Sequence, residues 1–271
     1  MTTETTQIAR SFVTARQEAK ALPDFPGQLP RDLATGYRVQ DAAIALWPDS
    51  VAGWKIGRVP AAQASVLGAD RVAGPIFSKL VWPARNGAEI PFPVYENGFA
   101  AVEAEYVFRI GADAPADKTT WTRAEAEGLI AAMHVGVELA GSPLATINDL
   151  GSTVVVSDFG NNHGLILGPE VPNWRAELDK GLHAETFIEG ERVGEGGADS
   201  KNDGPLDALA FLAGHLAQRG MPLKAGQLIS TGAVTGVHDI RIGQRSRVSF
   251  NGSGDILCAA VKAGANGKGF S

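Results

Sequence analysis

From Val51 onward, short apolar runs alternate with clusters of Gly, Pro, Asn and Asp, and this pattern constrains the fold more than any other feature. Such runs are typical of strands, and the clusters between them are typical of turns. They predict strands near 52–57, 76–82, 101–110, 132–140, 164–168, 184–189, 227–231, 246–250 and 255–262, and helices near 60–67, 122–131 and 205–219. Strands and helices do not alternate regularly, so we expect a mixed, mostly β domain.

Two helices are predicted before Val51. Apolar side chains at Ile8, Phe12 and Val13 among polar neighbours predict a helix near residues 4–20. A second helix is predicted from Leu33 to Leu46, where the apolar residues follow the spacing of one helical face. We therefore expect an α+β chain with a helical N-terminal segment at residues 1–50 and a β-rich domain at 51–271.

Composition excludes several classes of protein. The net charge is −6 and no basic patch follows the sequence, so nucleic acid is not an expected partner. The single cysteine, Cys258, rules out a disulfide within the chain and a Cys-rich zinc site. Two glycine clusters, 194–197 and 232–236, lack the spacing of phosphate-binding loops and are predicted to be turns.

The N-terminus has neither a basic start nor an apolar stretch, so no signal peptide is expected. No window approaches the roughly 18 uninterrupted apolar residues of a membrane span. The sequence therefore predicts a cytoplasmic protein that does not bind membranes.

The segment Val102-Glu103-Ala104-Glu105 carries the first candidate site. Side chains alternate faces in a strand, so Glu103 and Glu105 point the same way, about 6.6 Å apart along it. The simplest interpretation is one solvated strand face. However, two carboxylates so close repel each other, and a divalent cation between them removes that repulsion. Magnesium and manganese prefer oxygen ligands of this kind.

Glu138 is the second candidate, because it interrupts a run that is otherwise almost entirely apolar. A strand buried on both faces has such a sequence. A carboxylate there must be paired, metal-bound or protonated, since burying it alone is costly. His134 shares its face but lies about 13 Å away along the strand, so we interpret it as a packed histidine rather than a ligand.

Three further segments are weaker candidates. Lys55 lies among small and apolar residues near a strand end, although a surface lysine with a buried stem would look the same. The polar loop at 157–164 and the small-residue turn at 228–233 are typical of site loops, and equally of ordinary turns.

Taken in order, these segments resemble the hydratase and decarboxylase branch of the fumarylacetoacetate hydrolase superfamily, over roughly residues 30–262. The Lys-Ile-Gly at 55–57, the Glu-Ala-Glu at 103–105 and the strand of Glu138 carry most of the resemblance. The loop of Asp158 and the Ser-Thr-Gly at 230–232 add to it.

The resemblance implies a mixed β-roll or sandwich domain behind a helical N-terminal segment, assembled as a dimer or larger homo-oligomer. Glu103, Glu105 and Glu138 match the family's three metal ligands, which normally bind Mg²⁺ or Mn²⁺.

The same resemblance implies the roles of four other residues. Lys55 matches the family's active-site lysine and is expected to act in catalysis and substrate binding. Asp158 matches a loop position near the substrate and is expected to be catalytic. Thr231, with its neighbour Gly232, is expected to contact the substrate.

The implied activity is that of a metal-dependent hydratase, a lyase acting on a 2-hydroxy-2,4-dienoate or 2-oxo-4-enoate small acid in aromatic-compound catabolism through a metal-chelated enolate. One departure keeps alternatives open. Such hydratases carry an acid shortly before a Gly-x-Leu-Phe segment, whereas Val72 and Ala73 stand there in this chain. Decarboxylation of an oxalocrotonate-like acid and C–C hydrolysis of an acylpyruvate are therefore alternatives, and a non-catalytic binding module is a third.

The residues around the substrate's tail are not readable from the sequence. The candidates to line the pocket around the tail are Trp82, Arg85, His134 and His163, and the sequence is equally compatible with none of them doing so.

Overall fold

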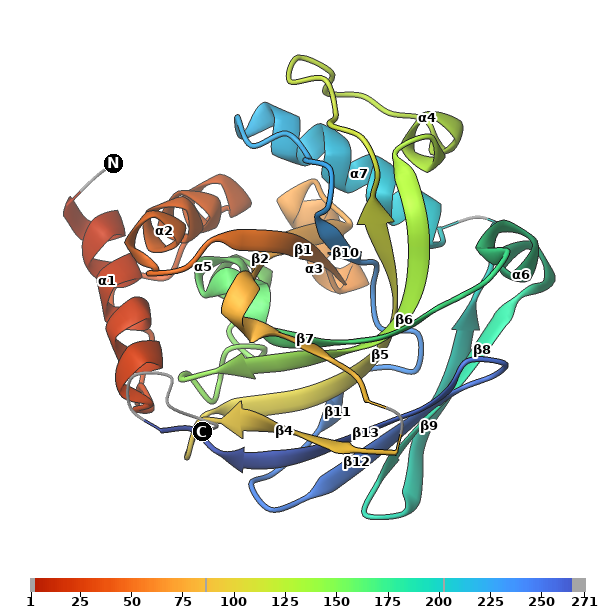
Figure 1. The fold of residues 1–271 in the computed structure, drawn as a ribbon. Coiled ribbons are helices and arrows are strands. Elements are labelled where there is room, and N and C mark those ends of the chain that lie inside the picture. Colours follow the sequence, from red (N-terminus) through yellow and green to blue (C-terminus); the bar gives the residue numbers. More distant parts are fainter. Residues whose placement is uncertain (1–2, 86, 202, 265–271) are drawn as a thin grey trace.

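The computed structural model describes residues 3–85, 87–201 and 203–264, and it contains two β-sheets flanked by helices (Figure 1). Within those ranges no helix combines the length and the apolar character needed to span a bilayer.

The larger sheet is mixed, with parallel and antiparallel neighbours. In spatial order its strands are β2 (Arg71–Phe77), β1 (Val51–Arg58), β10 (Leu228–Ser230), β5 (Phe99–Ile110), β6 (Ile130–Ser142), β7 (Asn162–Glu170) and β3 (Val81–Pro83), and β11 (His238–Asp239) also pairs with β5. The sheet brings β1, β10 and β5 side by side although they are far apart in sequence. Residues of all three can therefore meet over one face.

The smaller sheet has five strands, and it packs against the larger one through a shared core. Its order is β4 (Glu89–Val94), β13 (Gly254–Lys262), β12 (Arg245–Phe250), β8 (Leu182–Ile188) and β9 (Glu191–Ala198). Alternate residues of β5, from Val102 to Phe108, enter this core together with Val248 of β12 and Cys258 of β13. Because side chains alternate along a strand, Glu103 and Glu105 are turned to the other face.

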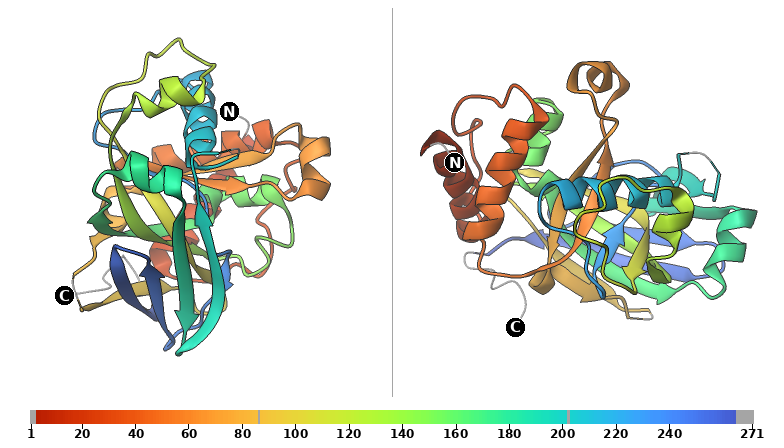
Figure 2. Two further views of the ribbon diagram at one scale, coloured as in Figure 1. Left: turned by 90° about the vertical axis from the view of Figure 1, so that its right-hand side faces the viewer. Right: turned by 90° about the horizontal axis from the view of Figure 1, so that it is seen from above.

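The helices lie around the two sheets (Figures 1 and 2). The two N-terminal helices, α1 (Thr3–Glu18) and α2 (Leu33–Leu46), lie together at one side of the sheets (Figures 1 and 2). They form a second apolar cluster with Phe77 and Phe159. The remaining helices are α3 (Ala61–Leu67), α4 (Arg123–Glu127), α5 (Ser152–Ser157), α6 (Trp174–Lys180) and α7 (Pro205–Gln218), with short 3₁₀ turns η1 (Ser78–Leu80) and η2 (Phe159–Asn161).

Most expected elements are present, but two were placed wrongly. The strand expected at 76–82 is two strands, β2 and β3, because the Asp49 carboxylate accepts hydrogen bonds from Ser78 and from the Lys79 N–H and so holds a turn between them. The helix expected at 122–131 is only α4. Thr122 and Glu125 form a capping box at its start, and Gly128 ends it before β6.

The glycine cluster at 194–197, predicted to be a turn, lies inside β9. There a Cβ on Gly196 would come within 1.9 Å of the Val234 carbonyl oxygen, and one on Gly197 within 2.0 Å of the Leu182 oxygen. Glycine is needed because another backbone segment approaches closely, not because the chain turns.

Candidate functional site

The three glutamates come together on adjacent strands. Glu103 of β5 is the direct cross-strand partner of Glu138 of β6, and Glu105 follows two residues later on the same face. One carboxylate oxygen from each lies within 4.8 Å of the other two. All three are buried, with 5% of Glu103 exposed and none of Glu105 or Glu138.

Lys55 reaches the same cluster from β1. The strand β10 lies between β1 and β5, with Ser230 opposite both Lys55 and Val107. The Lys55 Nζ lies 3.3 Å from Glu138 Oε1, and the side chain is 6% exposed. Lys55 is therefore a buried partner of the carboxylates and not a surface lysine.

Two asparagines complete the contacts, and neither was among the residues predicted for the site. The Lys55 Nζ donates to Asn161 Oδ1 at 3.1 Å, and Asn162 Nδ2 donates to Glu138 Oε1 at 3.1 Å. Both belong to the polar loop at 157–164. The composition of that loop was a signal of a site, but it did not show which members turn inward.

The turn after β10 supplies a backbone donor. The Gly232 N–H donates to Glu105 Oε2 at 2.6 Å. Gly232 has a φ of 124°, a conformation that favours glycine. The Thr231 hydroxyl donates to the Tyr106 carbonyl at 2.7 Å and so fixes the turn against β5.

The cluster has more negative charge than its neighbours balance. Burial raises the pKa of Glu103 to about 7, and burial together with Glu138 and Glu103 raises the pKa of Glu105 well above its usual range. Burial alone works to lower the pKa of Lys55, but the three glutamates raise it overall. One lysine thus faces three carboxyl groups.

Two carboxylate oxygens in this cluster, Glu105 Oε1 and Glu138 Oε2, are buried without a hydrogen-bond partner among the described residues. Buried polar atoms of this kind normally have a partner, and divalent cations bind carboxylate oxygens. The donor set and its surplus charge therefore fit a hard divalent cation.

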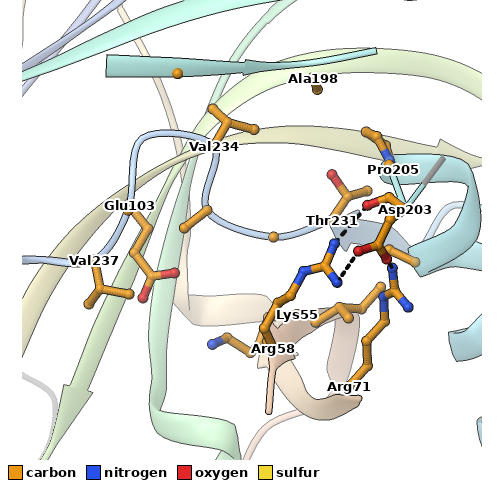
Figure 3. Close-up of a pocket in the computed structure, with 18 of the residues that line it drawn as sticks. Lys55, Arg58, Arg71, Glu103, Ala198, Asp203, Pro205, Thr231, Val234 and Val237 are labelled. Atoms are coloured by element: carbon orange, nitrogen blue, oxygen red, sulfur yellow. Dashed lines mark hydrogen bonds and ion pairs between the residues drawn. The ribbon is translucent and has the colours of Figure 1, made fainter. Parts of the chain in front are cut away.

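A cavity of about 970 Å³ opens above the cluster (Figure 3). Lys55, Glu103, Asn161, Thr231 and Gly232 line it. Of the three glutamates, Glu103 is the one among its lining residues, whereas Glu105 and Glu138 are fully buried next to it. Of the four candidates for the substrate's tail named from the sequence, none lines this cavity.

Asp158 occupies a different position from the other candidates. It is 1% exposed and does not line the cavity. Its carboxylate accepts from Arg16 Nε at 2.6 Å, from Arg16 Nη2 at 2.9 Å and from Ser142 Oγ at 2.6 Å. Such a carboxylate has no free oxygen to offer a substrate. We therefore assign it to the support of the 158–162 loop, and its predicted catalytic role lacks the geometry it requires.

No family model matches the chain. The chain is 29% identical over 258 residues to 2-keto-4-pentenoate hydratase of Paraburkholderia xenovorans, with 92% of each chain covered. Its fold matches 4-oxalocrotonate decarboxylase of Pseudomonas putida G7, solved with magnesium and adipate, at a TM-score of 0.77 and 20% identity, covering 96% of this chain and 99% of that one. The chain is thus similar to enzymes of the fumarylacetoacetate hydrolase superfamily, as its sequence motifs led us to expect.

A more distant member of the superfamily, fumarylpyruvate hydrolase of Pseudomonas aeruginosa, was solved with Mn²⁺ and pyruvate. It matches at a TM-score of 0.56 and 19% identity, covering 77% of this chain and 88% of that one. These fold matches confirm the expected α+β architecture of the fumarylacetoacetate hydrolase type.

Proposed function

We propose that the chain is a divalent-metal-dependent lyase, a hydratase acting on a small 2-hydroxy-2,4-dienoate or 2-oxo-4-enoate acid. The observation that carries the proposal is the buried cluster of Glu103, Glu105 and Glu138 beside Lys55, of which Glu103 and Lys55 line one cavity. The similarity to 2-keto-4-pentenoate hydratases supports the reaction type.

The three glutamates would hold Mg²⁺ or Mn²⁺. When bound, the cation supplies positive charge opposite the negative charge that develops on a 2-oxo acid as it enolises. The Gly232 N–H orients one of these ligands by donating to Glu105. Asn162 orients another by donating to Glu138.

Lys55 provides the proton chemistry in this proposal. Its ammonium group has three N–H donors, of which one is used by Asn161 and one points to Glu138. The third can donate to a substrate oxygen or move a proton as a general acid. Asn161 limits the orientations of the ammonium group, so this proton is presented in a defined direction.

A second reaction on the same site is favoured by one observation. At the positions where the hydratases carry that acid, Val72 lines the cavity with an apolar side chain, and the Ala73 N–H donates to the Tyr37 hydroxyl. Decarboxylation consumes no water and so needs no acid there to position one, which favours it over hydration; C–C hydrolysis is a further alternative, although it does consume water. NMR analysis of the products separates the reactions, because only decarboxylation releases carbon dioxide and only hydrolysis yields two acids.

The proposal is tested by titrating oxalate into metal-free protein with and without Mg²⁺ in a calorimeter. Oxalate is expected to bind only with Mg²⁺, and Glu103→Gln is expected to weaken that binding at least tenfold, since a ligand charge is lost. Glu191→Gln, on an exposed position of β9, is the matched control and is expected to bind like the wild type. Binding that is indifferent to Mg²⁺ would contradict the proposal.

A further inference from the structure

The cavity has a second charged end, away from the glutamates, which the proposed reaction does not use. Arg58 and Arg71 line it there together with Asp203 (Figure 3). Arg58 and Arg71 are direct cross-strand partners on the antiparallel pair β1 and β2. Like charges directly opposite each other destabilise a strand pair, so this position needs an anion between the two side chains.

Asp203 supplies that anion. Its carboxylate lies 2.5 Å from Arg58 Nη1, and its other oxygen accepts a short hydrogen bond from Arg71 Nη2. Its backbone carbonyl also accepts from Arg58 Nη2 at 2.7 Å. Asp203 stands in the turn before α7 with a φ of 65°, which is uncommon for a residue other than glycine. The chain thus places a carboxylate between two guanidinium groups at the cavity wall.

The ion pair between Arg58 and Asp203 contributes little to the stability of the fold. The side chains of Arg58 and Asp203 are each 55% exposed, and exposed ion pairs of this kind add at most about 1 kcal/mol to stability. Arg71 is better buried, with 8% of its side chain exposed, and keeps Asp70 as a second partner at 2.8 Å. Among the described residues, no carboxylate other than that of Asp203 forms an ion pair with Arg58. If Asp203 moves aside, the Arg58 guanidinium is therefore free for another carboxylate.

We propose that Arg58 and Arg71 form a subsite for a second carboxylate of the substrate, and that Asp203 occupies it between turnovers. The inference rests on the proposed function, because the glutamates and Lys55 would fix the 2-oxo acid end of the same molecule. The substrate class is then a short-chain dicarboxylic 2-oxo acid rather than a monocarboxylic one.

The spacing between Lys55, at the glutamate end of the cavity, and Arg58, at its other end, supports a substrate with two carboxylates. Arg58 follows Lys55 by three residues on β1, about 10 Å along the strand. Both side chains enter the same cavity, whose volume of about 970 Å³ exceeds the needs of a small monocarboxylic acid. Planar guanidinium groups bind carboxylates in a fixed, two-pronged geometry, which suits selection between a carboxylate and a methyl end.

The test compares 2-oxoadipate with 2-oxohexanoate, which have the same carbon chain and differ only in the distal carboxylate. Calorimetric titration with saturating Mg²⁺ is expected to show that the wild type binds 2-oxoadipate at least tenfold more tightly, as a charge-assisted hydrogen bond predicts. Arg58→Met is expected to remove this preference and leave the affinity for 2-oxohexanoate unchanged. Arg241→Met, an exposed arginine outside the cavity, is the matched control and is expected to keep the preference.

Asp203→Asn tests directly whether a substrate carboxylate exchanges with the Asp203 carboxylate in the subsite. It removes the internal competitor and is expected to tighten 2-oxoadipate about tenfold without changing 2-oxohexanoate. Equal binding of the two acids by the wild type, with no effect of Arg58→Met, would overturn the subsite and leave the proposed function standing. Weaker or unchanged binding of 2-oxoadipate by Asp203→Asn would overturn the exchange. Failure of both acids to bind with Mg²⁺ would overturn the proposed function and the subsite together.

Discussion

Two buried cations, Arg16 and Lys55, each pair with carboxylates and contact the 158–162 loop, but their surroundings differ. Arg16 donates to Asp158 through Nε and Nη2, and also to the carbonyls of Gly141 and Asn162 at 2.9 and 3.0 Å. One cation meets one carboxylate, and the oxygens of Asp158 are both bonded. Lys55 instead meets three carboxyl groups, and two of their oxygens have no partner among the described residues.

The two clusters therefore suit different roles: the Arg16–Asp158 pair supports the fold, and the cluster around Lys55 suits ligand binding. A buried pair whose hydrogen bonds are complete has nothing left to offer a ligand, and it serves to fix the chain. A buried cluster with surplus charge and unpaired oxygens is unfavourable until something binds it. The complete pair also holds the backbone from which Asn161 and Asn162 reach the incomplete one.

The largest expected effect comes from breaking the complete pair. Arg16→Met leaves the Asp158 carboxylate buried without its partner, which is expected to lower the free energy of unfolding by about 3–5 kcal/mol. Urea denaturation followed by circular dichroism measures the loss. Arg10→Met, an exposed position on the same helix, is the control and is expected to change stability little. A loss below about 1 kcal/mol would show that the pair does not hold the loop.

The incomplete cluster is expected to respond to metal instead. Mg²⁺ at about a hundred times its dissociation constant is expected to stabilise the wild type by about 2.7 kcal/mol, and chelation is expected to reverse this. Glu138→Gln is expected to abolish the response, because it removes one ligand charge, while Arg10→Met keeps it. Thermal unfolding with and without Mg²⁺ measures the shift. An equal shift in Glu138→Gln would place the cation elsewhere.

A smaller effect is expected for Gly232→Ala, because Gly232 has a positive φ and its N–H donates to the site residue Glu105. Ala at this φ of 124° is expected to cost about 1–3 kcal/mol of stability, and the displaced N–H is expected to weaken Mg²⁺ binding through Glu105. Gly226→Ala is the matched control, since Gly226 has a φ of 87° and no atom near its missing Cβ. Both variants should lose stability, but only Gly232→Ala should lose Mg²⁺ affinity in calorimetry.

The smallest effect is expected in the pH dependence of the complete pair. His163 lies beside Arg16, and burial followed by the Arg16 charge holds its pKa well below 6.5 in the folded protein. The unfolded chain therefore binds more protons below pH 6.5, so stability is full above that pH and is lost as the pH falls. His163→Gln is expected to flatten this dependence in urea titrations between pH 7 and 5. An unchanged slope would assign it to other groups.

The sequence pattern located β1, β5, β6, β7 and β10 of the larger sheet, because their apolar runs are distinct. In the same sheet it merged parts of β2 and β3 into one strand and did not predict β11. It missed β4 and β9, which form the two edges of the smaller sheet. Pro91 and Pro93 are tolerated in β4 because an edge strand needs fewer backbone donors. Whether a strand lies at the edge of a sheet depends on which other strands pair with it, and the local sequence pattern does not contain that information.

The candidate site was predicted in part for the same reason. Glu103, Glu105 and Glu138 were selected from strand alternation and apolar context, which are local properties. Asp158 was selected from its loop, but its partner Arg16 is 142 residues away and decides its role. A signal did exist, because Arg16 follows Ile8 and Phe12 at intervals of four and thus lies on the apolar face of the first helix.

The pairing of β1 with β10 also sets an order of assembly during synthesis. Glu103, Glu105 and Glu138 belong to neighbouring antiparallel strands that are close in sequence, so they can meet early. Lys55 can take its place only when residues 228–230 have left the ribosome, because β10 joins its strand to the others. The carboxylates therefore gather before the lysine that partly neutralises them. Until β10 is in place, the three carboxyl groups lack their lysine partner, and a divalent cation would be the natural group to balance them.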